Sequence, residues 1–318
     1  HHVTAPSRVT LFRLHPPLQS GPKTTQCPAT QPGAALPKSG PADVEAAVKA
    51  ARAAYEKWRL VPAPARGDIM RKIGDLLVQR KEELATLMTR EMGKVLAETR
   101  GDVQEGIDTA YYAATEGRRL FGHTVPSELP NKFAMAIRVP IGVAGIITPW
   151  NFPLAIPTWK MFPAILSGNT VVFKPASDTP AVAAALVQLM AEAGLPDGVV
   201  NIVHGGGGAV GNAITRHTDI DLISFTGSTM IGKQITKDSA ETLKRVSLEL
   251  GGKNAQIVMD DADLDLALDG ILWGAFGTTG QRCTATSRVV VQKGIAAKLT
   301  ELLVAGAKKL KVGNGLEA

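Results

Sequence analysis

The segment VAGIITPWNFP, residues 143–153, begins with an apolar run typical of a buried strand and ends in a turn bracketed by prolines. Strands and helices then alternate along the chain. We predict further strands at 170–174, 199–203, 222–226 and 245–250. Helices are predicted between them at 157–167, 179–193, near 209–217 and near 229–239. Short strands that alternate with longer helices predict an α/β fold with a doubly wound parallel sheet.

Polar residues or glycine occur where four of these strands end, at Asn151, Lys174, Gly227 and Glu249. In doubly wound sheets, ligands bind at the carboxyl ends of the strands, so we expect a ligand site there. The run FTGSTMIG, residues 225–232, adds a strand–turn–helix whose free N–H groups can receive a phosphate. It lacks the GxGxxG fingerprint, so by itself this signal is weak.

The flanking segments suggest the domain limits. Before residue 143 we predict helices at 44–58 (with Asp43 as N-cap), 65–91 and 94–120, then a hairpin at 121–139. After residue 250 the predicted order is strand 255–259, helix 264–276, strand 287–292 and helix 295–311. Two strands and two helices cannot enclose a separate core. We therefore divide the chain into an atypical or disordered segment (1–42), a ligand-binding domain (43–250) and an incomplete second α/β domain (251–318).

Composition excludes several classes of protein. The net charge is +6, but residues 1–42 contain four basic residues and no acid, which leaves +2 for the remaining 276 residues. That body has no dense basic stripe for nucleic acid, and no apolar run long enough to span a membrane. Two cysteines form no disulfide framework, so we expect a reduced, cytoplasmic location. The six histidines show no metal-ligand spacing, and we expect no metal site.

Three residues can carry chemistry. Cys283 stands in the open turn GQRCTA (280–285), where a thiolate can act as a nucleophile. Glu249 ends a strand before two glycines and can act as a base, and the amide of Asn151 can donate to an oxyanion. Each has a plainer interpretation: Cys283 as a packing residue, Glu249 as a surface or capping carboxylate, Asn151 as a turn former before proline.

Five motifs together resemble the aldehyde dehydrogenase superfamily in order and approximate spacing. They are TPWNFP (148–153), FKP (173–175), FTGST (225–229), ELGGK (249–253) and GQRC (280–283). The resemblance covers residues 43–318. It implies a Rossmann-like NAD(P)-binding domain over 43–250, an oligomerisation hairpin near 121–139, and the start of a truncated catalytic domain over 251–318.

The resemblance also implies roles for particular residues. Cys283 is the nucleophile, Glu249 the general base, Asn151 an oxyanion donor and Lys160 a group near the proton path. Lys174 contacts the adenosine ribose, and Gly227 and Ser228 lie beside the pyrophosphate. The full set of implied cofactor-binding residues is Ile147, Thr148, Pro149, Trp150, Lys174, Ser177, Gly227, Ser228, Gly232 and Leu250.

The implied reaction is oxidation of an aldehyde to a carboxylic acid through a thioester on Cys283. Many members that prefer NAD have an acid at the position of Ser177, so we expect NADP to be accepted, or preferred, beside NAD. The amino-acid sequence around Cys283 is most similar to that of bacterial enzymes acting on 2-oxoglutarate semialdehyde and related aldehydes. Trp159 stands where succinic-semialdehyde specialists often have arginine, which disfavours that substrate. By the same resemblance, Ile156 and Trp159 lie where the family lines its aldehyde tunnel, which implies an apolar passage for the substrate.

Three alternatives stay open. A CoA-acylating relative would usually lack Glu249. A cysteine hydrolase would pair Cys283 with a histidine, although no histidine follows His217. A non-catalytic remnant would keep nucleotide binding or dimer contacts. The motifs end before the family's later segments. We therefore expect the chain alone to be poorly active and unstable through exposed apolar surface, and the full-length parent to be a homodimer or homotetramer.

Overall fold

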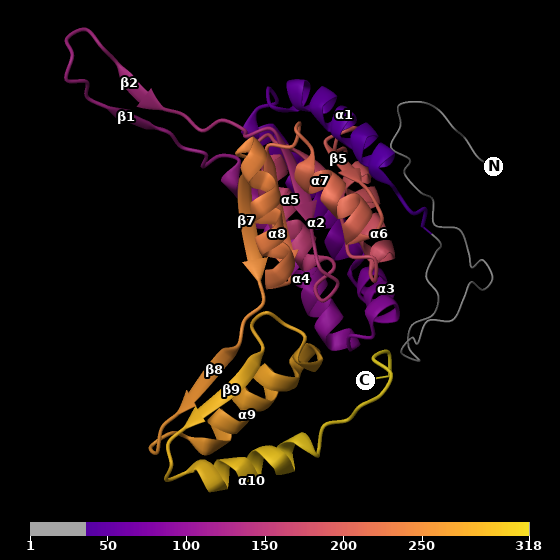
Figure 1. The fold of residues 1–318 in the computed structure, drawn as a ribbon, viewed down its shortest axis with the longest axis vertical. Helices are drawn as coiled ribbons and strands as arrows, with labels where there is room; N and C mark the ends of the chain where they lie inside the picture. The colour runs from indigo at the N-terminus through magenta and orange to yellow at the C-terminus, as the bar shows by residue number, and fades with distance from the viewer. Residues whose placement is uncertain (1–35, 318) are drawn as a thin grey trace.

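The computed structural model describes residues 36–317, and its centre is a five-stranded parallel sheet in the order β5-β4-β3-β6-β7 (Figure 1). The strands are β3 (Val143–Ile147), β4 (Thr170–Lys174), β5 (Val200–Ile202), β6 (Leu222–Gly227) and β7 (Arg245–Leu250). The chain moves outward from β3 to β4 and β5, then returns to the other side of β3 for β6 and β7. The predicted doubly wound parallel sheet is confirmed.

Helices cover both faces of this sheet. They are α1 (Pro41–Trp58), α2 (Ala63–Gln79), α3 (Lys81–Met92), α4 (Leu96–Glu116), α5 (Ala155–Leu166), α6 (Pro180–Glu192), α7 (Asn212–Arg216) and α8 (Thr229–Ser239). A π-helical turn (Gly207–Gly211) precedes α7, and a 3₁₀ turn (Ala240–Thr242) follows α8.

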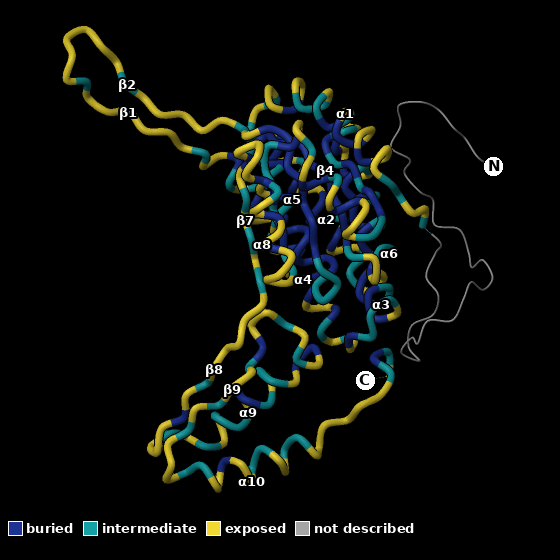
Figure 2. Tube along the Cα trace, in the orientation of Figure 1, coloured by how far each residue is buried: buried dark blue, intermediate teal, exposed yellow. Residues whose placement is uncertain are grey.

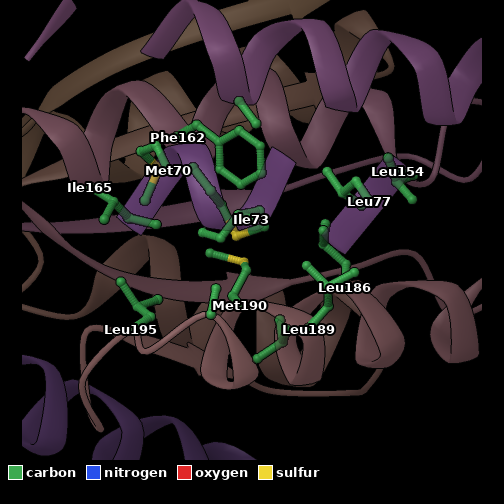
Figure 3. Packing of buried hydrophobic residues seen from close by; sticks show 14 of the residues in the cluster. Met70, Ile73, Leu77, Leu154, Phe162, Ile165, Leu186, Leu189, Met190 and Leu195 are labelled. Atoms are coloured by element: carbon green, nitrogen blue, oxygen red, sulfur yellow. The ribbon is translucent and has the colours of Figure 1, made fainter. Parts of the chain in front are cut away.

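Two separate apolar clusters show how the sheet is buried. On one face, side chains of α2 to α6 pack against Ala144, Ile146 and Phe173, as Figure 3 shows for residues such as Met70, Phe162 and Leu186. On the other face, side chains of α1, α7 and α8 pack against alternate strand positions such as Val143 and Val172. Because strand side chains alternate between faces, one strand supplies both clusters, which is why β3 and the middle three residues of β4 are apolar.

Most helix boundaries differ from those predicted by a few residues, and two of the differences have a clear structural cause. Helix α1 begins at Pro41, with Gly40 as its N-cap, and Asp43 is the third helical residue. Its carboxylate accepts the N–H of Gly40 at 2.8 Å, so the prediction of Asp43 as N-cap was wrong by three positions. The helix predicted over 65–91 is two helices, because the chain leaves helical geometry at Arg80 (φ −105°, ψ 15°), which pairs with Glu192 of α6.

A hairpin projects from the body, and a smaller unit follows β7 (Figure 1). Strands β1 (His123–Val125) and β2 (Ala134–Ala136) pair antiparallel within the range where a hairpin was predicted. The smaller unit contains β8 (Asn254–Val258), α9 (Leu264–Phe276), a 3₁₀ turn (Gly277–Gly280), β9 (Thr286–Val291) and α10 (Ala296–Ala307). Its two strands pair parallel, and its core contains only three fully buried apolar residues, so most of it is coloured as intermediate or exposed in Figure 2.

Of the first segment that we distinguished, residues 1–35 lie outside the described residues, and residues 41 and 42 belong to α1.

The contact between α3 and α6 contains a carboxylate with an unusual pKa. Glu91 accepts the N–H groups of Ala181 at 2.7 Å and Val182 at 2.9 Å, in the first turn of α6. Burial raises the pKa of Glu91 to about 7, although the two backbone N–H donors act to lower it. The folded state therefore binds the proton of the Glu91 carboxyl more tightly than the unfolded state does.

This raised pKa predicts a pH-dependent stability. Below the ordinary pKa of 4.5 the contribution of Glu91 is fully present, and it is lost as the pH rises through about 7, because the folded state then loses its bound proton. We expect the difference in unfolding free energy between wild type and Glu91→Gln to fall over this pH range in urea titrations. Glu83→Gln, on an exposed position of α3, is the control. Parallel stability curves for wild type and Glu91→Gln would contradict the prediction.

Candidate active site

The order of strands creates a junction between β3 and β6. On one side of it the chain adds β4 and β5, and on the other side it adds β6 and β7. The last paired residues are Ile147 and Phe225, and the next residue on each strand is a threonine, Thr148 and Thr226. Both hydroxyl oxygens are buried, and neither has a hydrogen-bond partner within residues 36–317. Buried hydroxyls are normally paired, so two unpaired ones at the junction point to a ligand that supplies the partners.

Helix α8 begins directly beside this junction. Ser228 is its N-cap, and the Ser228 hydroxyl accepts the N–H of Ile231 at 3.4 Å. Gly227 and Gly232 have no room for a side chain: a Cβ on Gly227 would collide with the Phe225 ring, and one on Gly232 would lie 2.6 Å from Leu250. The exposed start of an eleven-residue helix is thereby held at the strand ends, a position suited to an anion.

A second group of predicted cofactor residues lies at the end of β4. Lys174 is buried, its ammonium donates to the carbonyl of Pro175 at 2.9 Å, and burial lowers its pKa, with the charge of Asp178 acting in the opposite direction. The Ser177 hydroxyl donates to the carbonyl of Gly205 at 3.3 Å. His204 has two buried ring nitrogens without partners in the described chain. Burial lowers its pKa, and the Lys174 charge lowers it further.

The turn after β3 reaches the turn that contains the cysteine. The side-chain amide of Asn151 donates to the carbonyl of Gln281 at 2.7 Å, two residues before Cys283. The amide of Asn254 donates to the carbonyl of Cys283 at 2.6 Å. Cys283 itself is a free, exposed thiol. A Cβ on Gly252 would lie 3.7 Å from the Cys283 carbonyl oxygen, so the segment after Glu249 also approaches this turn.

Lys160 lies among polar groups from two strands. Its ammonium donates to the hydroxyl of Ser224 on β6 at 3.0 Å. Burial lowers the pKa of Lys160 to about 8, while the charge of Glu249 acts to raise it. Lys160 on α5 and Glu249 at the end of β7 are thus electrostatically coupled across β6. The exposed Glu249 carboxylate is accessible to water.

The remaining predicted residues lie at the same edge of the sheet. Ile147 is buried as the last residue of β3, Pro149 and Trp150 are half-buried in the turn that follows, and Leu250 ends β7 half-buried. Of the two residues predicted for an apolar passage, Ile156 is buried and Trp159 is 44% exposed. Sequence reasoning missed Thr226, His204 and Ser224. Thr226 had a signal, because it stands inside the quoted FTGST motif at a strand end.

Comparisons with known proteins identify the family. Residues 19–318 match the profile of the Aldehyde dehydrogenase family. The chain belongs to the aldehyde dehydrogenase family. It is 46% identical over 275 residues to the alpha-ketoglutaric semialdehyde dehydrogenase of Bacillus subtilis (86% of this chain and 56% of the relative). It is 44% identical over 282 residues to the NADP(+) succinate-semialdehyde dehydrogenase of Escherichia coli (89% and 58%).

Solved structures agree with the predicted fold. An NADP-dependent enzyme from E. coli superposes with a TM-score of 0.87 at 44% identity, over 89% of this chain and 59% of that one. A betaine aldehyde dehydrogenase from Staphylococcus aureus in complex with NAD+ gives 0.87 at 38% identity, over 88% and 56%. The chain therefore spans somewhat less than two thirds of the length of these relatives.

The described residues lack both a membrane-spanning helix and a cluster of metal ligands. None of the helices within residues 36–317 is long and apolar enough to cross a membrane. The same residues contain no cluster of three or more histidine, cysteine or acidic side chains suited to a metal ion.

The coupling of Lys160 and Glu249 is testable without turnover. Glu249→Gln removes the negative charge that raises the pKa of Lys160, so we expect that pKa to fall below its value in wild type. The pH dependence of Lys160 acetylation, resolved by mass spectrometry, measures it. Glu241→Gln, an exposed acid beyond α8, is the control and should leave the pKa unchanged. Equal Lys160 pKa values in both variants would show that Glu249 does not face Lys160.

Proposed function

We propose that this protein oxidises an aldehyde to a carboxylic acid with NAD(P), through a thioester on Cys283. Two contacts to backbone carbonyls support this proposal: the Asn151 amide donates to Gln281, and the Asn254 amide donates to Cys283. They join the turn that contains the exposed Cys283 thiol to the turn after β3 and to the segment that follows Glu249. A thiolate nucleophile, an oxyanion donor and a carboxylate base are the groups that acyl chemistry at a carbonyl carbon needs.

The strand ends fit a dinucleotide. The unpaired hydroxyls of Thr148 and Thr226 offer hydrogen bonds at the junction of β3 and β6, and the start of α8 offers free N–H groups and positive dipole for a pyrophosphate. Lys174 and Ser177 would meet the adenosine ribose, and His204 offers further unpaired nitrogens nearby. When bound, the nicotinamide supplies the hydride acceptor for the oxidation.

The chain's own residues carry the remaining steps. The Cys283 thiolate adds to the carbonyl carbon and holds the substrate covalently, while the Asn151 amide donates to the oxygen that gains negative charge. After oxidation the acyl group remains on Cys283 as a thioester. Glu249 takes a proton from water, the hydroxide attacks the acyl carbon, and the thiolate leaves. Lys160, which is electrostatically coupled to Glu249, would hold an ammonium near that proton path.

The names of the relatives support a proposal for the substrate class. The names of two of them refer to the semialdehydes of alpha-ketoglutarate and succinate. We propose an aldehyde with a carboxylate at its far end, with 2-oxoglutarate semialdehyde as the first candidate. Trp159, where succinic-semialdehyde specialists often have arginine, disfavours succinic semialdehyde.

We also propose how this protein assembles and where in the cell it acts. The hairpin of β1 and β2 exposes Phe133, Met135 and Ile137, each by more than 60%. Such a projecting apolar surface supports self-association of this protein as a homodimer or homotetramer. A thiolate enzyme also requires a reducing compartment, which supports a cytoplasmic location.

Cys283 and Glu249 are predicted to affect different steps. Cys283→Ala should lower formation of reduced nicotinamide by about a thousandfold or more, because the nucleophile is lost. Glu249→Gln should keep a burst of reduced nicotinamide stoichiometric with enzyme, yet lower the steady-state rate by about 10² to 10⁴, because only hydrolysis needs the base. Stopped-flow absorbance measures both. Cys27→Ala is the matched control for thiol loss.

Other outcomes would favour other functions. A steady state that requires CoA would support a CoA-acylating enzyme, which the presence of Glu249 disfavours. Binding of NADP without any burst would support a nucleotide-binding protein. Ester cleavage that depends on Cys283, without nicotinamide reduction, would support a cysteine hydrolase. Wild-type turnover in Cys283→Ala would refute the thioester route.

Ser177 is predicted to set the choice of coenzyme. A glutamate at this position would repel a 2′-phosphate, so Ser177→Glu should lower the ratio of kcat/KM for NADP to that for NAD by about tenfold or more. Ser177→Gln has the same shape without the charge and should retain most of the wild-type ratio. A wild-type protein that already uses NAD at least about tenfold better than NADP would remove this prediction.

A further inference from the structure

Helix α4 presents two carboxylates, four residues apart, to the two turns of the candidate active site. Glu98 and Asp102 lie on one side of the helix, because residues at this spacing are neighbours on a helical surface. Neither belongs to the chemical groups described above. Their hydrogen-bond partners are nevertheless the turn that contains Asn151 and the turn that leads to Cys283.

Asp102 fixes the first turn. Its carboxylate accepts the N–H of Ala155 at 2.7 Å and the ammonium of Lys94 at 2.9 Å, and both side chains of this ion pair are fully buried (1% and 0% exposed). The Lys94 ammonium also lies 3.7 Å from the ring centroid of Phe152, next to Asn151. A buried charge pair tolerates little displacement, since separation leaves each charge unpaired in an apolar surrounding. The position of residues 151–155 is thereby tied to α4.

Glu98 fixes the second turn. Its two carboxylate oxygens lie 2.9 and 3.0 Å from the backbone nitrogen of Thr278, and one of them accepts the Thr278 hydroxyl at 2.9 Å. Thr278, Thr279 and Gly280 all have left-handed backbone geometry, with φ of 51°, 56° and 71°. This geometry is costly for β-branched residues and persists only when surrounding contacts hold it. The carboxylate of Glu98 is such a contact, and Cys283 follows three residues after the turn.

A third contact closes the arrangement. The Asn151 amide donates to the Gln281 carbonyl, which joins the two turns directly. Glu98, Asp102 and Asn151 thus connect helix α4, the asparagine turn and the cysteine turn in one closed set of hydrogen bonds. The sequence separation is large, 180 residues between Glu98 and Thr278, so neither turn can acquire its position locally.

We propose that Glu98 is a positioning residue that holds the strained turn 278–280, and with it Cys283, at the distance from Asn151 that Asp102 sets. This inference rests on the proposed roles of Cys283 and Asn151. In this proposal Glu98 has no direct role toward substrate or coenzyme. It acts through the backbone of Thr278, so its loss should alter the reacting geometry rather than coenzyme binding.

The test uses Glu98, since removal of the buried Asp102 carboxylate would endanger the fold. Glu98→Ala should make amide hydrogen exchange in residues 277–285 about tenfold faster and lower kcat by about tenfold to a hundredfold, with KM for NADP within about twofold. The control is Glu105→Ala, at an exposed position two turns further along α4. A second background, Thr279→Gly, makes left-handed geometry intrinsic to the chain without removing a Glu98 contact.

The double variant separates positioning from a general structural role. If Glu98 holds the strained turn, Glu98→Ala should cost clearly less in the Thr279→Gly background, in both exchange and kcat. Equal costs in both backgrounds, or exchange and kcat unchanged as in Glu105→Ala, would overturn the inference. Faster local exchange that Thr279→Gly rescues, in a protein that reduces no nicotinamide, would support the positioning and refute the proposed function.

Discussion

The parallel pairing of β3 with β6 is the constraint on which the rest of the site depends. It places strands that are distant in sequence side by side, with Ile147 opposite Phe225, so that both carboxyl ends reach the same edge. The direction in which successive strands are added reverses at this point, because β4 and β5 extend to one side of β3, and β6 and β7 to the other. The unpaired hydroxyls of Thr148 and Thr226 and the start of α8 are direct consequences of that junction.

Chemistry at this edge requires groups from outside the sheet. The thiol of Cys283 comes from the smaller unit. The Asn151 amide joins its turn to the end of β3 through the Gln281 carbonyl, and the Asn254 amide holds the turn to β8 within the smaller unit. Glu249 is the penultimate residue of β7, five residues before β8 begins, and thus lies close to the connection between the two units. Motion of the smaller unit relative to the sheet would therefore change the geometry around Cys283, which gives the anchoring contacts of α4 their importance.

The sequence predicted the fold well where the hydrophobic pattern and the residues that end helices and strands agreed. Strand 170–174 and helix 229–239 were predicted with their observed limits, because an apolar strand and an amphipathic helix were each bounded by proline, glycine or serine. The helix boundary at Arg80 had no such signal. No glycine or proline stands there, and the break coincides with a tertiary contact, the pairing of Arg80 with Glu192 of α6. The candidate site also contains residues that the sequence could predict and residues that it could not. The strand-end residues were predictable from topology, whereas contacts such as Ser224 on Lys160 or Glu98 on Thr278 join segments whose proximity only the folded chain defines.

We propose that Cys283 and Glu249 face one dinucleotide at the junction of β3 and β6, and a crystal structure of the protein with NADP would test this arrangement. We expect the pyrophosphate at the start of α8, hydrogen bonds from Thr148 or Thr226 to the ligand, and the Cys283 sulfur and Glu249 carboxylate on either side of the nicotinamide. A dinucleotide bound away from these strand ends, or a thiol and carboxylate on opposite faces with no cleft between them, would contradict it.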